Sequence, residues 1–159
     1  MSNSFSPSVQ KVQDALKVLG LPNDVMELQS TTRTSAEAAL AVGCSVGQIA
    51  KSIVFRATQT DKPILVIASG SNRVNEKRIE ELIFEPIGKA DADYVRKHTG
   101  FVIGGVPPIG HLQKIAIFID EDLLTYSEIW AAAGSQHAVF KLTPSDLIKM
   151  TGGRMVSIK

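Results

Sequence analysis

Apolar residues along this chain follow two different spacings, which together predict a mixed α/β protein. Spacing typical of amphipathic helices predicts helices over 7–19, 35–42, 76–83, 91–99, 126–133 and 144–150. Short apolar runs predict strands over 25–28, 51–56, 64–68, 101–103, 115–119, 138–142 and 155–158. Helices and strands alternate irregularly, without a repeat or a linker, so we expect one domain over 1–159.

Polar residues and glycines mark the ends of several predicted helices. Thr34-x-x-Glu37 and Ser45-x-x-Gln48 have the form of capping boxes, and Gly43 should end the helix that the first box begins. Other predicted N-caps are Ser6, Asn75, Asp91 and Thr143.

Two short connections indicate how the strands pair. Two connections, from Phe55 to Ile64 and from Val102 to Ile115, are each too short for a parallel crossover. We therefore expect the strands on either side of each connection to be antiparallel. The predicted fold is mixed α+β, with a mixed, largely antiparallel and curved sheet of about six or seven strands surrounded by helices.

Composition and charge limit the classes of function. Hydrophobic residues make up 44% and charged residues 21% of the chain, as in soluble globular proteins. A net charge of +1 argues against a broad basic surface for nucleic acid but leaves room for a local patch. The single cysteine, Cys44, excludes an intramolecular disulfide and a Cys-rich zinc site. Residues 1–7 lack the form of a signal peptide and no apolar run is long enough to span a membrane, so we expect a cytoplasmic protein.

The stretch 100–111, read GFVIGGVPPIGH, is the most unusual part of the chain. Its glycines permit close backbone approach and positive φ, while Pro107 and Pro108 fix φ and remove two N–H donors. A tight structural turn is the ordinary interpretation of such a stretch. Four glycines and two prolines in twelve residues exceed what a reversal requires, and this favours a loop that recognises a small polar group with its backbone.

Few side chains stand out as candidates for chemistry. Lys51 precedes an apolar run, where it is either a plain surface charge or an anchor for a phosphate or carboxylate. His98, His111 and His137 have no metal-ligand spacing, so we expect no metal site, although His111 or His137 could donate to a ligand. No Walker loop occurs, because no Gly-Lys-Ser or Gly-Lys-Thr is present.

Three segments in order resemble a known family: 34–39 (TSAEAA), 47–55 (GQIAKSIVF) and 104–111 (GGVPPIGH). They are similar to the YbaK/ProX family of single-domain aminoacyl-tRNA deacylases, which resemble the editing insertion domain of bacterial prolyl-tRNA synthetase. The resemblance runs from the second predicted helix to the C-terminus. It implies hydrolysis of the ester between a mistakenly attached amino acid and the 3′ end of transfer RNA, without a metal or organic cofactor.

The resemblance also implies which residues form the site. The family lysine that matches Lys51 supports substrate binding and activity, and the loop matching 104–108 supplies backbone groups around the terminal adenosine and the ester. The candidate catalytic residues are therefore Lys51, Gly104 and Gly105. Candidate substrate-binding residues are Ile53, Phe55, Val106, Pro107, Pro108, Gly110, His111 and His137.

Two departures from the family pattern concern the substrate. Val106-Pro107-Pro108 replaces the Cys-Ser-Pro of YbaK-type members, and Val139 stands about where those members have an aspartate. Both departures favour the ProX-like branch over the cysteine-specific one. The implied substrate is then transfer RNA for proline that carries alanine or a similar small residue. The resemblance also makes prolyl-tRNA synthetase a candidate partner. No side chain is an evident general base, and in the family a ribose hydroxyl of the substrate helps to activate the water.

Two alternatives to this enzyme remain open. A non-catalytic module of the same fold would bind aminoacyl-tRNA or a synthetase without turnover. Lys51 and the intact loop favour the enzyme, because neither is needed to stabilise a sheet. A nucleotide-binding or DNA-binding protein is disfavoured by the near-neutral charge and by the absence of phosphate motifs.

Overall fold

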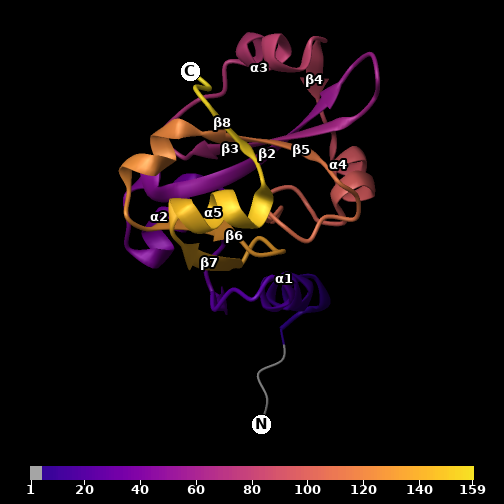
Figure 1. Cartoon of the computed structure of the whole chain (residues 1–159). Helices are drawn as coiled ribbons and strands as arrows, with labels where there is room; N and C mark the ends of the chain where they lie inside the picture. The colour runs from indigo at the N-terminus through magenta and orange to yellow at the C-terminus, as the bar shows by residue number, and fades with distance from the viewer. Residues whose placement is uncertain (1–4) are drawn as a thin grey trace.

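The computed structural model describes residues 5–159 (Figure 1). The first four residues of segment 1–7, which lacks the form of a signal peptide, therefore lie outside the described residues. The described residues form five α-helices, two short 3₁₀ helices and eight strands. The helices are α1 (Pro7–Val18), α2 (Ser35–Val42), η1 (Val46–Gln48), α3 (Glu76–Ile83), α4 (Ala92–Thr99), η2 (Glu121–Thr125) and α5 (Pro144–Thr151). The strands are β1 (Val25–Glu27), β2 (Ile49–Ala57), β3 (Pro63–Ser69), β4 (Ile87–Lys89), β5 (Ala116–Asp120), β6 (Ile129–Ala132), β7 (Ala138–Leu142) and β8 (Arg154–Val156).

The described strands form one mixed sheet in the order β1-β7-β6-β2-β3-β5-β8, with β4 paired to β2 beside this path. Strands β2 and β3 form the central antiparallel hairpin, as predicted. Strand β6 runs parallel to β2, and β5 runs parallel to both β3 and β8. The predicted mixed α/β fold is confirmed, although the sheet has more strands than the about six or seven expected.

Strand β3 is buried on both faces, which explains its uninterrupted apolar run. Leu65 and Ile67 pack in the cluster that contains residues of α1, α4 and α5. Val66 and Ala68 pack on the other face with Ile79 of α3. Figure 1 shows the same arrangement, with α3 and α1 at opposite ends of the view.

Local capping signals are confirmed at most helix ends. Both reciprocal capping boxes form, and Gly43 ends α2 in the left-handed conformation with φ +74°. Asp91 and Thr143 cap α4 and α5 through their side chains. Ser6 and Asn75 precede α1 and α3 as predicted, but their side chains make no capping hydrogen bond.

The helix predicted over 126–133 is wrong, because half of this segment, Ile129–Ala132, forms strand β6. Ile129 and Ala131 are buried while Trp130 and Ala132 are half-buried, which is the alternation of a strand. Strand β6 pairs with β7 on one edge and with β2 on the other. This pairing outweighs the helix propensity of the alanines, which is a weak preference.

The strand predicted over 101–103 is also wrong. The N–H of Phe101 donates to the Thr99 hydroxyl (3.0 Å) rather than to another strand, and Ile103 is exposed. The antiparallel pairing expected between the segments around Val102 and Ile115 therefore does not occur, and β5 instead pairs in parallel with β3. Strand β4 was not predicted, because three residues with a central glycine are too short to show a period.

Candidate functional site

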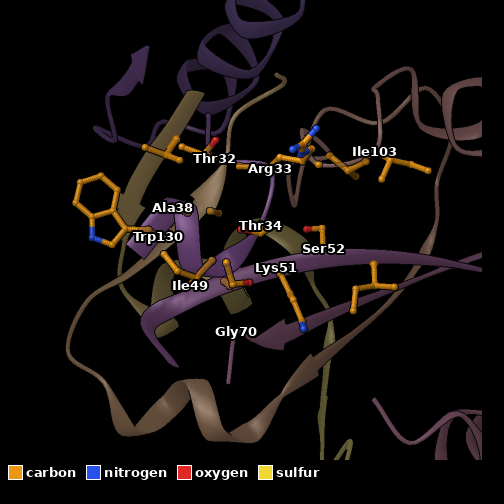
Figure 2. Close-up of a pocket in the computed structure, with 18 residues that line it drawn as sticks. Thr32, Arg33, Thr34, Ala38, Ile49, Lys51, Ser52, Gly70, Ile103 and Trp130 are labelled. Carbon is orange, nitrogen blue, oxygen red and sulfur yellow. The ribbon is translucent and has the colours of Figure 1, made fainter. Parts of the chain in front are cut away.

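A cavity of about 450 Å³ lies between the segment that leads into α2, strand β2, the glycine-rich loop and strand β6. Figure 2 shows that it has two ends. The side chains of Thr32, Ala38, Ile49 and Trp130 lie toward one end, and those of Lys51, Ser52 and Ile103 lie toward the other. We call these the Thr32 end and the Lys51 end.

Lys51 supplies a cation to this cavity from strand β2, where it pairs with Ala68 of β3. Its side chain is half-buried, and no carboxylate among residues 5–159 lies within 4.0 Å of its ammonium group. Burial lowers the pKa of Lys51 from its ordinary value, and the positive charge of Arg73 lowers it further. Of the described residues that line the cavity, only Lys51 and Arg33 are charged. The site is therefore suited to a group that carries negative charge.

The glycine-rich loop reaches the cavity because it packs directly against the turn after β6. A Cβ on Gly105 would lie 2.8 Å from the Cα of Ser135, so no larger residue fits without movement. The N–H of Gly134 donates to the Gly105 carbonyl (2.9 Å), and the Gly105 N–H donates to the Val102 carbonyl (2.9 Å). This contact fixes the loop backbone at the cavity wall.

Gln136 in the same turn connects two walls of the cavity. Its side-chain amide donates to the Ile103 carbonyl (2.9 Å), next to Gly104, which has φ +86°. Its backbone carbonyl accepts from the N–H of Thr32 (2.6 Å). The turn thereby sets the position of the loop and of the segment before α2 together.

Two hydroxyl groups in the cavity wall are buried without a hydrogen-bond partner in residues 5–159. They are Oγ1 of Thr32 and Oγ of Ser52. Thr32 is 6% exposed, and it lies at the end opposite Lys51 (Figure 2). Buried polar groups in folded proteins are nearly always paired, so these two hydroxyls are exceptions within the described chain.

The structure brings four of the predicted site residues together around this cavity. They are Lys51, Ile53, Gly104 and Val106. Gly105 supports the loop from behind, against Ser135. A second cavity, of about 490 Å³, shares Ile53, Gly104 and Val106 and is also lined by Phe55.

The remaining predicted residues lie elsewhere. Pro108, Gly110 and His111 line a separate hollow of about 400 Å³ against α1 and α5. Pro107 is buried, and its carbonyl accepts from Nε2 of His111 (2.7 Å). His137 is exposed and does not line any of these three cavities.

His111 is placed to stabilise the loop rather than to face the cavity. Burial lowers its pKa from the ordinary value, which favours the neutral ring. The neutral ring donates from Nε2 to the Pro107 carbonyl and stands edge-on to Phe101. These contacts hold the proline part of the loop in one conformation.

The cavity is also lined by residues that the sequence analysis did not name as site candidates: Thr32, Arg33, Ser52 and Trp130. Thr32 and Arg33 directly precede the Thr34 capping box, so their place before a helix start was a usable signal. Ser52 follows Lys51 in the chain. Trp130 offered no such signal, because its strand was predicted as a helix.

Two further properties concern the described residues as a whole. Within 5–159, no group of three or more His, Cys, Asp or Glu side chains is arranged to hold a metal ion. None of the helices in that part of the chain is both long enough and apolar enough to cross a membrane.

Comparisons with known proteins show the family of this chain. Residues 29–150 match the model of the family described as "Aminoacyl-tRNA editing domain". The chain is 31% identical over 125 residues to uncharacterized protein YwhH of Bacillus subtilis, covering 79% of each protein. It is 24% identical over 131 residues to "Putative Cys-tRNA(Pro)/Cys-tRNA(Cys) deacylase EbsC" of Enterococcus faecalis, covering 81% of this chain and 79% of EbsC.

A solved structure is similar over nearly its whole length. It is described as "a putative trans-editing enzyme for prolyl tRNA synthetase", and it superposes with a TM-score of 0.92 at 44% identity, covering 98% of this chain and 99% of the other. The family model matches well over half of the chain, and the motifs around Lys51 and Gly104 had indicated the same family. This chain belongs to the aminoacyl-tRNA editing domain family.

Proposed function

We propose that this protein is a trans-editing deacylase of the ProX-like branch. It hydrolyses the ester of a small amino acid, such as alanine, that has been mistakenly attached to transfer RNA, in particular transfer RNA for proline. The observation that carries the proposal is a single cavity in which Lys51 and the loop at Gly104 meet. The printed names of EbsC and of the superposed structure, a deacylase and a trans-editing enzyme, support the same class of reaction.

Ester hydrolysis requires a placed water, a proton acceptor and stabilisation of the oxyanion. The N–H of Gly105 is already bonded to Val102, whereas for the amides of Gly104 and Val106 no acceptor is found within residues 5–159. Those two amides are therefore the ones available to an oxyanion. Gly105 contributes through its close packing against Ser135.

The proton acceptor comes from the substrate in this proposal. None of the described residues lining the cavity is Asp, Glu or His, so no side chain there is an evident general base for the attacking water. A ribose hydroxyl of the terminal nucleotide, next to the scissile ester, positions the water instead. Lys51 offers its charge to the terminal phosphate or to negative charge that develops on the ester.

Selection against correctly charged transfer RNA depends on size. Short side chains form part of the cavity wall, among them Ala38, Ala131 and Val139. A difference of one methylene is worth only about 1–3 kcal/mol in a hydrophobic pocket, so affinity alone discriminates weakly. Steric exclusion of the larger proline ring, with admission of a smaller side chain, is the more effective arrangement.

The charge of the protein indicates how it meets transfer RNA. A net charge of +1 gives little long-range attraction to a polyanion, so the contact is limited to the acceptor end. Prolyl-tRNA synthetase is the partner that would deliver this end, and the cytoplasm is where such charging occurs. Neither a membrane nor DNA has a part in this proposal.

The test is deacylation of transfer RNA for proline charged with alanine, serine, cysteine, 2-aminobutyrate or proline, by the wild type and by Lys51→Ala. We expect release of one or more small residues, sparing of proline, and impaired hydrolysis by a folded Lys51→Ala protein. Replacement of the terminal 2′-hydroxyl by hydrogen should abolish turnover and leave binding. Hydrolysis of none of these esters, with retained binding of an uncleavable analogue, would contradict the proposal and identify a non-catalytic binding module.

A further inference from the structure

We infer that Arg33 is a substrate-binding residue whose guanidinium group holds the phosphate on the 5′ side of the terminal nucleotide of transfer RNA. Lys51 is then left to interact with the ester itself. This inference rests on the proposed deacylase function, because it divides the substrate of that reaction between the two cations that line the cavity.

Arg33 is an exposed cation without an ion pair. No carboxylate in the described part of the chain lies within 4.0 Å of its guanidinium group. The carboxylate of Glu37, four residues along the chain, accepts from the N–H of Thr34 (3.2 Å) in the capping box of α2, so it already serves the start of that helix. A free guanidinium group beside a cavity suits a phosphate, because its planar fork can donate two parallel hydrogen bonds to phosphate oxygens.

The stem of the Arg33 side chain packs over the glycine-rich loop. Its Cγ lies 3.2 Å from the place where a Cβ on Gly104 would stand. The backbone before it is held by the hydrogen bond from the Thr32 N–H to the Gln136 carbonyl (2.6 Å). In the proposed function the Gly104 amide is available to the oxyanion, and the ester and the 5′ phosphate are attached to opposite sides of one ribose. The guanidinium group of Arg33 is therefore in reach of that phosphate.

The two cations point to different sides of the cavity (Figure 2). The guanidinium group of Arg33 lies on the side of Ile103. The ammonium group of Lys51 lies toward Gly70. Lys51 is half-buried, and a charge with less water around it acts more strongly on charge that develops at the ester. The phosphate, which joins the terminal nucleotide to the rest of the RNA, stays near solvent and meets the exposed Arg33.

Arg73 is the other arginine to consider, because its charge acts on Lys51. It does not line the cavity. The side chain of its neighbour Asn72 donates to the carboxylate of Asp120 (2.8 Å), so negative charge is already close to this part of the chain. A phosphate is therefore bound better by Arg33, and Arg73 provides a matched control with the same side chain.

The experiment compares the binding of two stable analogues in which an amide replaces the ester. One is 3′-alanylamino-3′-deoxyadenosine, and the other is the same compound with a methyl phosphate on its 5′ oxygen. We expect the wild type to bind the phosphorylated analogue about three- to tenfold more tightly. Arg33→Gln should lose this preference, because it removes the guanidinium group and keeps the Cγ that packs over Gly104. Arg33→Lys keeps the charge without the fork, so it should keep part of the preference.

Two control variants show whether the effect belongs to Arg33. Lys51→Met should bind both analogues with the same preference for the phosphorylated one as the wild type, since Lys51 is assigned to the ester. Arg73→Gln should also keep the preference. Both variants remove one positive charge, as Arg33→Gln does, so a general effect of net charge would appear in all three.

Kinetics with charged transfer RNA give a second measurement, with the small amino acid that the wild type releases fastest. Arg33→Gln should raise KM and change kcat little, because the phosphate is bound equally in the ground state and the transition state. The plot of log kcat/KM against log salt concentration should lose about 0.7 of its slope, the value for one contact to a single strand. Lys51→Met should instead lower kcat.

Thermal unfolding shows whether the variants are folded. Arg33→Gln removes no ion pair of the described chain, so it should melt within about 2 °C of the wild type. Equal affinity of the wild type for the two analogues would overturn this inference and leave the deacylase function intact. A preference that survives in a folded Arg33→Gln protein, or that is lost in Arg73→Gln or Lys51→Met instead, would do the same. Hydrolysis of none of the charged transfer RNAs by the wild type would overturn the proposed reaction and, with it, the division of the substrate between the two cations.

Discussion

Replacement of Gly105 by alanine should displace the loop that forms one wall of the cavity. The added Cβ would lie 2.8 Å from the Cα and carbonyl carbon of Ser135 and 2.9 Å from its nitrogen, whereas ordinary contact begins at 3.4 Å. All three atoms belong to the backbone, so no side-chain rotation relieves the contact. The loop or the turn must therefore move by about 0.6 Å, the difference between 3.4 and 2.8 Å.

The energetic cost of this movement has two parts. Overpacking of this kind costs about 1–3 kcal/mol. Distortion of the hydrogen bond from Gly134 to the Gly105 carbonyl costs about 1 kcal/mol more. A total of about 2–4 kcal/mol in a chain of this size lowers the melting temperature by roughly 5–15 °C.

The assay is thermal unfolding followed by circular dichroism, with deacylation measured well below the melting temperature. Gly88→Ala is the control, because Gly88 lies in strand β4 and its added Cβ would meet only the Thr58 side chain, at 3.3 Å. We expect Gly105→Ala to melt well below Gly88→Ala and to lose activity even where it is folded. Melting of the two variants within about 2 °C of each other, with both active, would refute the steric interpretation of the loop.

Two pH-dependent predictions follow from buried basic groups. Burial, and then the positive charge of Arg73, lower the pKa of Lys51 from 10.5. The charged ammonium group therefore destabilises the folded state at pH values below the folded pKa. This cost falls away as the pH rises from the folded pKa toward 10.5. In urea unfolding, Lys51→Met should have a higher free energy of unfolding than the wild type at about pH 7. A difference between the two proteins that does not shrink as the pH approaches 10.5 would contradict this. Burial likewise lowers the pKa of His111 below 6.5, so stability that is present above pH 6.5 is lost as pH falls through the folded pKa. The urea midpoint of His111→Gln should fall less than that of the wild type between pH 6.5 and about pH 5, and parallel curves would disprove the assignment.

Local chemistry allowed much of the fold to be predicted. The Thr34 capping box and Gly43 define α2 through contacts within a few residues, and the β2–β3 hairpin joins neighbours in the chain. Strand β6 was missed because its conformation depends on pairing with β2, some eighty residues earlier, as in the pair Ile49↔Trp130. Contacts between distant segments do not appear in a local apolar period.

The same distinction applies to the site. Lys51 and Gly104 belong to motifs that are visible in the chain, and the structure does bring them to one cavity. Thr32 carries no motif of its own. Its place in the cavity wall follows from the hydrogen bond to Gln136, which also holds Ile103 of the loop, so it becomes visible only when three distant segments meet.

The charges of the cavity supply a further reason for the orientation of the proposed substrate. The net charge of the chain is only +1, yet the two charged residues in the described cavity wall, Arg33 and Lys51, are both cations. The terminal phosphate is attracted to such a region, whereas the α-ammonium group of the amino acid is repelled, and partial burial strengthens both effects. The phosphate of the nucleotide is therefore drawn toward these cations, and the ammonium group of the amino acid is directed away from them.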